Sequence, residues 1–312
     1  MEPKIKREQK LGTISRIVST IFLILYLFGV PILIPKLWIF DSFENEGLAY
    51  FIITITWHEV FWLISNTFFI TLYKYDFEFF RKYKVNHVEW PWKSPQKESW
   101  NSLFYSTIKV LLLNHFIMVP ILLLPHLIAN KSPYRIDKSF ASHYEFIVQT
   151  AFFMICDDFC FYWSHRFLHI KSIYPYIHKL HHRYQNTISV AAEYAHPIEF
   201  FLGNVIPVNM GALILGRRVH LTTLLSYVAM KLYRTTEQHS GYEFPWNYNW
   251  YLPMASNPTF HNYHHLYFKG NYGAFFTFWD TFCNTVNKNY LVQTSVLPTD
   301  PYDKSTKTEK SE

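Results

Sequence analysis

The chain's most chemically informative feature is a set of histidines whose spacing suits metal binding. Neutral imidazole is the commonest side-chain metal ligand, and positions i, i+3 and i+4 share one face of a helix. Each cluster therefore directs two or three ring nitrogens towards one point. Eight converging imidazoles exceed the needs of one ordinary ion, so the pattern predicts a centre with two metal ions. The clusters are His165 and His169; His178, His181 and His182; and His261, His264 and His265.

Two isolated histidines and two carboxylates extend this predicted centre. His239 follows an expected helix end, and His196 precedes a proline; we expect both to be ligands. Asp158 continues the stripe of His165 into an apolar segment, where a carboxylate needs a partner. We expect Asp158, or less readily Asp157, to accept the second N–H of a ligand histidine; the alternative is a buried carboxylate that pairs helices. The other six histidines show no ligand spacing and are interpreted as structural or interfacial: His58, His87, His115, His126, His143 and His220.

The ligand set indicates which metal the centre binds. Calcium and magnesium prefer oxygen ligands, and structural zinc sites often use Cys, whereas none of the three Cys residues lies within a cluster. Imidazole suits Zn, Cu, Fe and Ni, and a pair of irons can reductively activate O₂ and oxidise an unactivated C–H bond. We expect a di-iron oxidase with no catalytic residue beyond the ligands. Its metal affinity should fall as the pH drops through ~6.5, because the site needs neutral imidazoles.

The composition indicates that these histidines belong to a membrane protein. Half of the 312 residues are hydrophobic and only 17% are charged, against roughly 25% charged residues in soluble domains. The formal net charge is +6, but no phosphate loop or nucleic-acid motif accompanies the basic residues. We therefore attribute the charge to membrane orientation and expect no nucleic-acid partner. An odd number of Cys implies no disulfide framework.

Apolar stretches predict an all-α fold with about four transmembrane helices and a helical, histidine-rich cytosolic cap. A spanning helix needs ~20 apolar residues. A fifth stretch at about 200–233 is interrupted by glycines and arginines, and we expect either a hairpin that dips into the bilayer or two shallow helices. The four predicted spans are 14–37, 48–73, 103–128 and 144–163.

The distribution of basic residues predicts the orientation of these spans. The basic start and the basic segment 74–100 should face the cytoplasm, whereas the acidic loop at 41–47 suits the lumen. Four spans then place His165 and everything after it in the cytosol, and a hairpin keeps His239 there too. The predicted division is a transmembrane region 1–164, a cytosolic di-iron region 165–292 and a disordered tail 293–312.

The order and spacing of the three clusters, H-x3-H, H-x2-HH and H-x2-HH, resemble those of the fatty acid hydroxylase superfamily of membrane di-iron enzymes. The resemblance covers roughly residues 150–285. It is greatest to the C-4 methylsterol monooxygenases, although the segment from His239 to Trp246 also resembles cholesterol 25-hydroxylases. The stretches that carry it are Ile177-His-Lys-Leu-His-His182, Ala192-Glu-Tyr-Ala-His-Pro197, His239-Ser-Gly-Tyr242, His261-Asn-Tyr-His-His265, Gly270-Asn-Tyr272 and Phe278-Trp-Asp280.

The resemblance implies a multi-pass enzyme of the endoplasmic reticulum membrane with both termini in the cytosol. It implies two iron ions, O₂, and electrons from NAD(P)H delivered by cytochrome b5 and its reductase. The implied reaction is oxidation of a sterol C-4 methyl group, with substrate entering from the bilayer. Another sterol or lipid hydroxylation, desaturation or side-chain dealkylation is the alternative. A metal transporter is a distant one, because transporters place their ligands inside spans and these clusters follow the last expected span.

Overall fold

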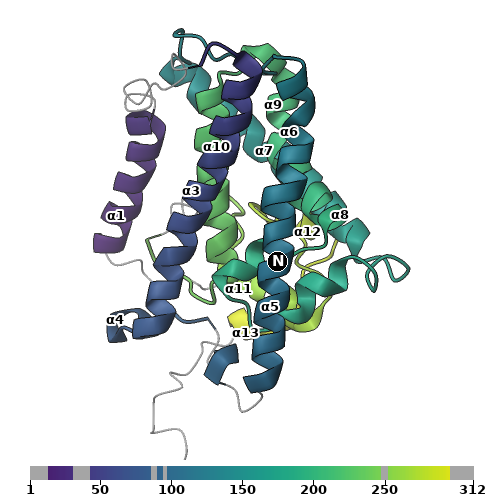
Figure 1. Cartoon of the computed structure of the whole chain (residues 1–312). Helices are drawn as coiled ribbons and strands as arrows, with labels where there is room; N and C mark the ends of the chain where they lie inside the picture. Colours follow the sequence, from purple (N-terminus) through teal and green to yellow (C-terminus); the bar gives the residue numbers. More distant parts are fainter. Residues whose placement is uncertain (1–12, 31–42, 86–89, 94–96, 247–251, 296–312) are drawn as a thin grey trace, which may run out of the picture.

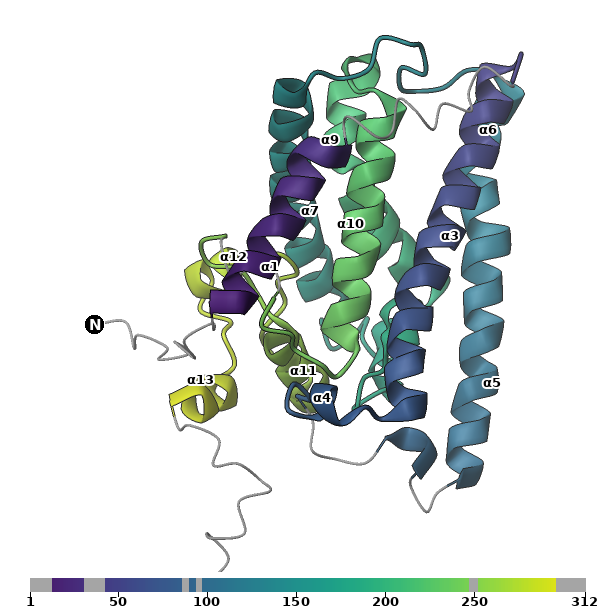
Figure 2. The ribbon, with the colours of Figure 1, turned by 90° about the vertical axis from the view of Figure 1, so that its left-hand side faces the viewer.

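A computed structural model describes residues 13–30, 43–85, 90–93, 97–246 and 252–295 of the chain. Within these ranges the structure is helical, with no strand and only three isolated β-bridges. This confirms the predicted all-α fold. The long helices form an antiparallel bundle, and the short helices of the C-terminal third gather at one end of it (Figures 1 and 2).

Five long helical segments build the bundle, and successive segments run in opposite directions (Figure 2). The second and fourth each contain a π-helical turn, η5 (Asn114–Met118) and η8 (Phe200–Val205), placed shortly before Pro120 and Pro207. A proline lacks its N–H and clashes with the carbonyl four residues earlier, which disrupts α-helical bonding there. The segments are α3 (Glu46–Tyr75); α5 (Lys97–Leu113) with η5 and α6 (Val119–Ile128); α7 (His143–Leu168); α8 (Pro197–Glu199) with η8 and α9 (Ile206–Leu215); and α10 (Leu221–His239).

Local capping residues fix where the long helices begin. The Asn45 side chain accepts from the Leu48 N–H at the start of α3. Ser142 and Glu145 form a reciprocal capping box at the start of α7. Each cap satisfies backbone N–H groups that have no partner within the helix. Because α7 carries His165 near its end, this start also determines where that histidine lies along the bundle.

Within the described residues, four helical segments are long and apolar enough to cross a membrane. Three match predicted spans, and the expected first span at 14–37 is described only in part and stays a prediction. Its described part comprises only α1 (Thr13–Ile24) and η1 (Leu25–Gly29), and the remainder lies outside the described residues. The fourth is instead part of the stretch that we expected to be broken. The four are Glu46–Tyr75, Trp100–Ile128, His143–Leu168 and Pro197–Arg218.

The stretch at 200–233 forms a full helical hairpin, in which Gly211 and Gly216 play different roles. Gly211 lies inside α9 and does not interrupt it; it allows α9 to lie directly against Phe153 of α7. Gly216 has φ +54° and ends α9, a conformation that Gly adopts at little steric cost. After this turn α10 runs back along the bundle, which returns the chain to the end where the histidines lie (Figure 2).

Helix α10 is the buried centre of the bundle although it carries charges. Lys231 Nζ lies 2.7 Å from Asp157 Oδ1 on α7, and the Tyr227 hydroxyl donates to the same carboxylate. Arg234 and Glu237 pair within α10 at 3.3 Å. Buried charges are tolerated when they are paired and hydrogen-bonded. These pairs let a polar helix pass through the apolar interior and end at His239.

Short helices and loops surround the lower end of α7 and α10. The segment that carries His178, His181 and His182 is a 3₁₀-helix, η6 (His178–Arg183). It is followed by η7 (Ser189–Glu193), α11 (Pro258–Tyr267), α12 (Phe278–Phe282) and α13 (Lys288–Ser295). The predicted disordered tail is therefore wrong for 293–295, which complete α13. The rest of that tail, 296–312, lies outside the described residues.

The contact between α7 and α9 gives a first prediction. A Cβ built on Gly211 would lie 2.7 Å from Phe153 Cδ1 and 2.9 Å from Phe153 Cα. Gly211→Val should therefore separate the helices and destabilise the protein by about 1–3 kcal/mol, measured as a lower thermal unfolding midpoint in detergent. Gly203→Ala is the matched control, because a Cβ there meets nothing within 4 Å. Equal midpoints for the two variants would contradict the proposed close packing.

Candidate metal centre

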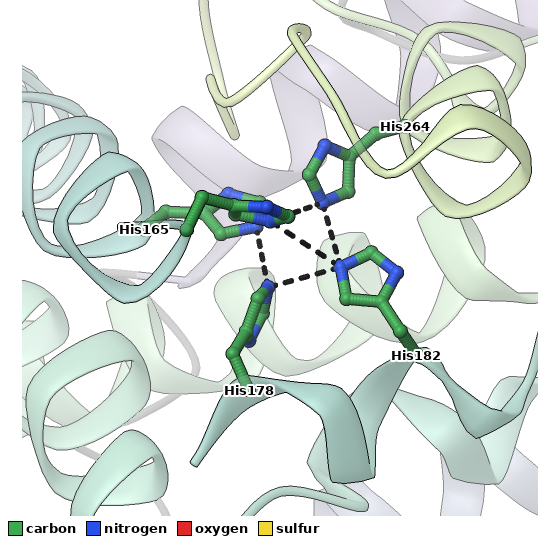
Figure 3. Close-up of side chains that lie close together, drawn as sticks. His165, His178, His182 and His264 are labelled. Carbon is green, nitrogen blue, oxygen red and sulfur yellow. Dashed lines mark hydrogen bonds between the residues drawn. The ribbon is translucent and has the colours of Figure 1, made fainter. Parts of the chain in front are cut away.

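Nine histidines from four parts of the chain converge into two adjacent groups. Figure 3 shows four rings of the first group, His165, His178, His182 and His264, facing one another. In each group, one ligand atom of every residue lies within 4.8 Å of the others. The first group combines the end of α7 with η6 and α11, and the second combines η6, α10 and α11. The first group is His165, His169, His178, His182 and His264; the second is His181, His239, His261 and His265.

Neighbouring histidines in the sequence divide between the two groups. His181 belongs to the second group and His182 to the first; likewise His265 belongs to the second and His264 to the first. Adjacent side chains on a helical turn point in different directions. The two H-H pairs therefore hold the groups side by side, and each pair fixes one group relative to the other.

The ring nitrogens of each group approach one another at distances expected for ligands of one ion. In the first group, His182 Nε2 lies 3.0 Å from His178 Nε2 and 3.1 Å from His264 Nε2. In the second, His261 Nε2 lies 2.9 Å from His239 Nε2 and 3.2 Å from His265 Nε2. Two nitrogens bound at ~2.1 Å to one ion lie roughly 3.0–3.4 Å apart at octahedral or tetrahedral angles.

The hydrogen bond made by the second ring nitrogen, Nδ1, determines whether Nε2 carries a proton or a free lone pair. In five of the nine rings, Nδ1 lies within hydrogen-bond distance of a backbone carbonyl oxygen, which can only accept, so Nδ1 carries the proton and Nε2 presents a lone pair. Lone pairs facing each other at about 3 Å repel unless a cation lies between them. The five contacts are His165 to Tyr272 O, His181 to Tyr194 O, His239 to Thr235 O, His264 to Gly270 O and His265 to Tyr184 O, and in a sixth ring Nδ1 of His178 faces Glu199 Oε1.

One of these acceptors depends on a glycine. Gly270 has φ +77°, and a Cβ on it would collide with the Thr285 carbonyl oxygen. Only glycine fits this turn without strain. Its carbonyl oxygen lies 2.7 Å from His264 Nδ1, so the turn positions the acceptor that orients a histidine of the first group.

Burial reinforces the neutral state of the rings. Desolvation, with repulsion from neighbouring rings as a smaller cause, lowers the pKa of His239 to about 3, and desolvation lowers that of His181 to about 4. The same causes hold the pKa of His264 and His265 well below their ordinary value. These imidazoles are therefore neutral at pH 7, the form that binds metal. The donor set fits two transition-metal ions, and it is consistent with iron.

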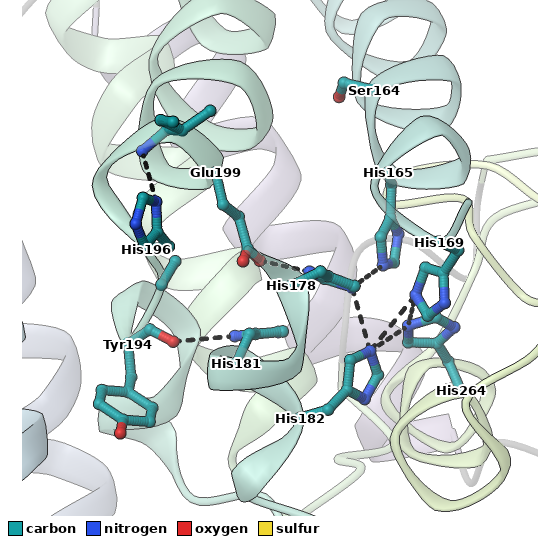
Figure 4. A network of polar contacts seen from close by, with 12 residues as sticks. Ser164, His165, His169, His178, His181, His182, Tyr194, His196, Glu199 and His264 are labelled. Carbon is teal, nitrogen blue, oxygen red and sulfur yellow. Dashed lines mark hydrogen bonds and ion pairs between the residues drawn. The ribbon is translucent and has the colours of Figure 1, made fainter. Parts of the chain in front are cut away.

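The structure supplies a carboxylate partner that the sequence analysis missed. Glu199 Oε1 lies 2.7 Å from Nδ1 of His178, and both side chains are buried (Figure 4). A carboxylate in this position fixes the ring orientation and raises the basicity of the ligand. The available signal was the proximity of Glu199 to His196 in the sequence, but only the fold brings it to a cluster 21 residues earlier.

Three predicted residues do not lie where the sequence analysis placed them. His196 joins neither group; its Nδ1 accepts from the Ile198 N–H and caps α8, away from the other rings (Figure 4). Asp157 pairs with Lys231. Asp158 accepts the backbone N–H groups of Phe275 and Phe276 at 3.0 and 2.9 Å, so it holds the loop that contains Tyr272 rather than a ligand itself.

A cavity borders both histidine groups. His165 and His178 of the first group and His181, His239 and His261 of the second contribute to its wall. The remaining wall is mostly apolar or small, with Phe161, Leu168, Ala192, Ala195, Gly203 and Ala274. Apolar cavities with a few polar groups are the usual form of small-molecule sites. An apolar group placed here would therefore lie beside both candidate metal positions.

Comparisons with known proteins agree with this geometry. The family model for fatty acid hydroxylases matches residues 150–285. A methylsterol monooxygenase of Arabidopsis thaliana is 33% identical over 80% of this chain and 89% of its own length, and one of Aspergillus fumigatus is 30% identical over 82% and 81%. A very-long-chain aldehyde decarbonylase of Oryza sativa is 40% identical, but over only 47% of this chain and 56% of its own. No solved structure matches.

The different positions of His181 and His196 predict different effects on metal content. His181→Ala removes one of four rings in the second group and should weaken metal binding there by roughly 10–100-fold or more. The metal retained per chain should therefore fall. His196→Ala should leave metal content unchanged, because its ring lies in neither group. Elemental analysis of the two purified variants makes the comparison. Equal losses in both would contradict the proposed ligand set.

The lowered pKa values also predict how stability depends on pH. The unfolded histidines bind protons below ~6.5, whereas buried His181 stays neutral until about pH 4 and His239 until about pH 3. The unfolded state therefore gains protons first, and metal-free protein should lose stability as the pH falls from 7 to 5. Each such histidine contributes up to about 1.4 kcal/mol per pH unit below 6.5. A thermal unfolding midpoint that stays constant over this range would contradict the neutral, buried rings.

Proposed function

This chain belongs to the fatty acid hydroxylase family, and from that membership we propose that it is a membrane-bound, O₂-dependent monooxygenase that oxidises a C-4 methyl group of a sterol. The observation that carries the proposal is the pair of histidine groups whose Nε2 atoms converge beside an apolar cavity. The relatives named methylsterol monooxygenase, which align over most of this chain, favour a sterol methyl group as the target.

The proposed metal ligands are the nine converging histidines, without His196. Two iron ions held by them would supply the reductive activation of O₂ that oxidation of an unactivated C–H bond requires. Glu199 and the backbone carbonyls of Tyr194, Tyr272 and Gly270 orient the ligand rings by accepting their Nδ1–H groups. These contacts hold the Nε2 atoms in place independently of substrate.

The protein positions the substrate and excludes water from it. Phe161, Leu168 and Ala274 give the cavity wall an apolar surface against which a methyl group can rest beside the ligands. Thr235, Gln238 and Asn204 are the neutral polar residues in the wall. Repeated oxidation of one methyl group requires the substrate to keep the same orientation. A rigid wall beside the ligands favours this.

Electron delivery and location are further parts of the proposal. We propose NAD(P)H as the electron source, through cytochrome b5 and its reductase, in the endoplasmic reticulum membrane with both termini in the cytosol. Lys74 lies in the last turn of α3, and α4 (Glu78–Arg81) ends with Arg81 and is capped by Lys82. In Figure 2, α4 lies at the same end of the bundle as α11, which carries three of the converging histidines. The positive charge of Lys74, Arg81 and Lys82 favours the cytosolic side for that end and offers a surface for an acidic electron donor.

A second candidate is another lipid oxidation at the same centre. The higher identity to the rice aldehyde decarbonylase over a shorter segment favours a shared metal centre with a different substrate. Sterol side-chain hydroxylation, desaturation and dealkylation belong to the same class of alternative. All of these retain the ligand set and differ in which carbon lies beside it.

The test is an assay of the full-length, iron-loaded protein in lipid nanodiscs with cytochrome b5, its reductase and NADPH. Products from a 4,4-dimethylsterol should be oxidised at a C-4 methyl group, as located by mass spectrometry, and a sterol without C-4 methyl groups should not react. Oxidation of the side chain, or reaction of the sterol without C-4 methyl groups, would support the second candidate instead.

Substitution at Gly203 tests whether the cavity holds the sterol. Gly203 is buried in η8 on the cavity wall, and a Cβ there meets nothing within 4 Å. Gly203→Leu should therefore extend into the cavity and reduce kcat/KM for the sterol by at least about tenfold. Iron content should stay unchanged, because a Cβ on Gly203 meets no ligand ring within 4 Å. Unchanged turnover, or loss of iron in step with activity, would contradict this placement.

A further inference from the structure

A second polar cluster lies inside the membrane-spanning part of the bundle, where the sequence analysis saw only scattered histidines. His58 and Glu59 lie on α3, His115 lies in η5, and Glu193 lies at the end of η7. His58, Glu59 and His115 each bring one ligand atom within 4.8 Å of the others. Ionisable residues inside a span are expensive to bury and usually mark a site.

The four side chains form a closed ring of alternating imidazoles and carboxylates. The two Nδ1 atoms approach Glu59, at 3.0 Å for His58 and 3.2 Å for His115. The two Nε2 atoms approach Glu193, at 3.3 Å for His58 and 2.9 Å for His115. Each imidazole therefore has one carboxylate at each nitrogen. In the described residues, the ion pairs of Glu59 and Glu193 are made with these two histidines alone.

The four-residue cluster lacks protons for two of its contacts and positive charge to balance its carboxylates. Two neutral imidazoles supply two N–H groups for four nitrogen–oxygen contacts, so two contacts oppose a ring lone pair to a carboxylate oxygen. The two carboxylates also carry two negative charges in a low-dielectric region. Two further protons or one divalent cation would resolve both deficits. The cluster therefore needs a total charge of +2 from added protons or from a bound cation.

The contact between His115 and Glu193 distinguishes these two solutions. Nε2 and Oε2 lie 2.9 Å apart, yet neither atom has a partner with hydrogen-bond alignment. A proton on this nitrogen would be poorly aligned with the oxygen, whereas a metal ion needs only that both atoms face it. Two imidazoles with a carboxylate form a common ligand set for zinc and for non-haem iron.

The cluster is buried on one side and reachable on the other. The His115 and Glu193 side chains are 2% and 6% exposed, whereas those of His58 and Glu59 are 14% and 17% exposed. The aromatic rings of Trp62 and Phe200 pack near His115, with centroids 5.1 and 6.2 Å from it. The cluster is therefore enclosed at His115 and Glu193 and partly exposed on the α3 side.

We propose that His58, Glu59, His115 and Glu193 bind a third divalent transition-metal ion, separate from the two histidine groups of the metal centre. The Nε2 atoms of His58 and His115 and the Glu193 carboxylate ligate the ion, and Glu59 accepts the Nδ1–H of both rings, as a carboxylate does behind metal-bound histidines. The charges of the ion and the two carboxylates cancel, which suits a buried position between spans.

This ion would connect the spans to the metal centre. Glu193 immediately precedes Tyr194, whose carbonyl oxygen accepts from His181. In the same segment, the Asn114 side chain next to His115 donates to the Ala195 carbonyl at 2.8 Å. A metal at the cluster therefore fixes α3 and η5 to the loop that orients a ligand of the second group.

The experiment counts ions in the full-length protein in lipid nanodiscs, loaded with Zn²⁺ as the probe and washed free of loosely bound metal. Elemental analysis should give about three ions per chain, two in the histidine groups and one in the cluster. A structure of this sample should show density among His58, His115 and the two carboxylates. Two ions per chain with no density in the cluster would overturn the proposal.

A matched pair of variants assigns the third ion. Glu59→Gln keeps the size of the side chain but removes a negative charge, and it should lose about one ion per chain. His126→Ala alters a histidine of the same span outside the cluster and should lose none. His181→Ala should lose metal from the centre while the cluster density remains. Glu59→Gln protein with the wild-type number of ions would overturn the proposal, as would loss of the cluster density in His126→Ala.

Discussion

The structure depends on one repeated interaction, the donation of Nδ1–H from a buried imidazole to a fixed oxygen. Backbone carbonyls serve five of the rings and Glu199 serves His178. Each donation settles the tautomer and leaves an Nε2 lone pair facing its neighbours. Without the oxygens, the rings could rotate and exchange hydrogen bonds with one another. With them, the rings form a preorganised donor set that a pair of metal ions completes.

The packing of the helical bundle brings these acceptor oxygens to one place. Tyr272 and Gly270 lie in the loop after α11, Tyr194 follows η7, and Thr235 is one turn before His239 on α10. Asp158 on α7 holds the 272–276 loop through two backbone N–H groups. The Lys231–Asp157 pair joins α10 to α7 in the interior. Charged groups that look anomalous in apolar helices are thus the contacts that align separate segments.

Sequence reasoning succeeded where the pattern was local. The apolar lengths predicted an all-α membrane protein, and the three clusters marked the residues that converge, because spacing of i, i+3 and i+4 acts within a single helical turn. It was less successful for contacts between segments. Gly211 reads as a helix breaker, but it lies in a close approach to Phe153. His58 and His115 are 57 residues apart in the sequence, and only the antiparallel pairing of their helices makes them neighbours.

The amino-acid sequence by itself determined the helical class, the apolar segments and the residue types able to bind metal, because each of these is a property of composition and short-range period. The tertiary structure alone decided which ring nitrogen faces inward, which group each histidine joins, that His196 caps a helix instead, and that Glu199 stands behind His178. The physical reason is that a hydrogen bond or a shared ion requires atoms within about 3 Å, and that proximity is set by how whole helices pack.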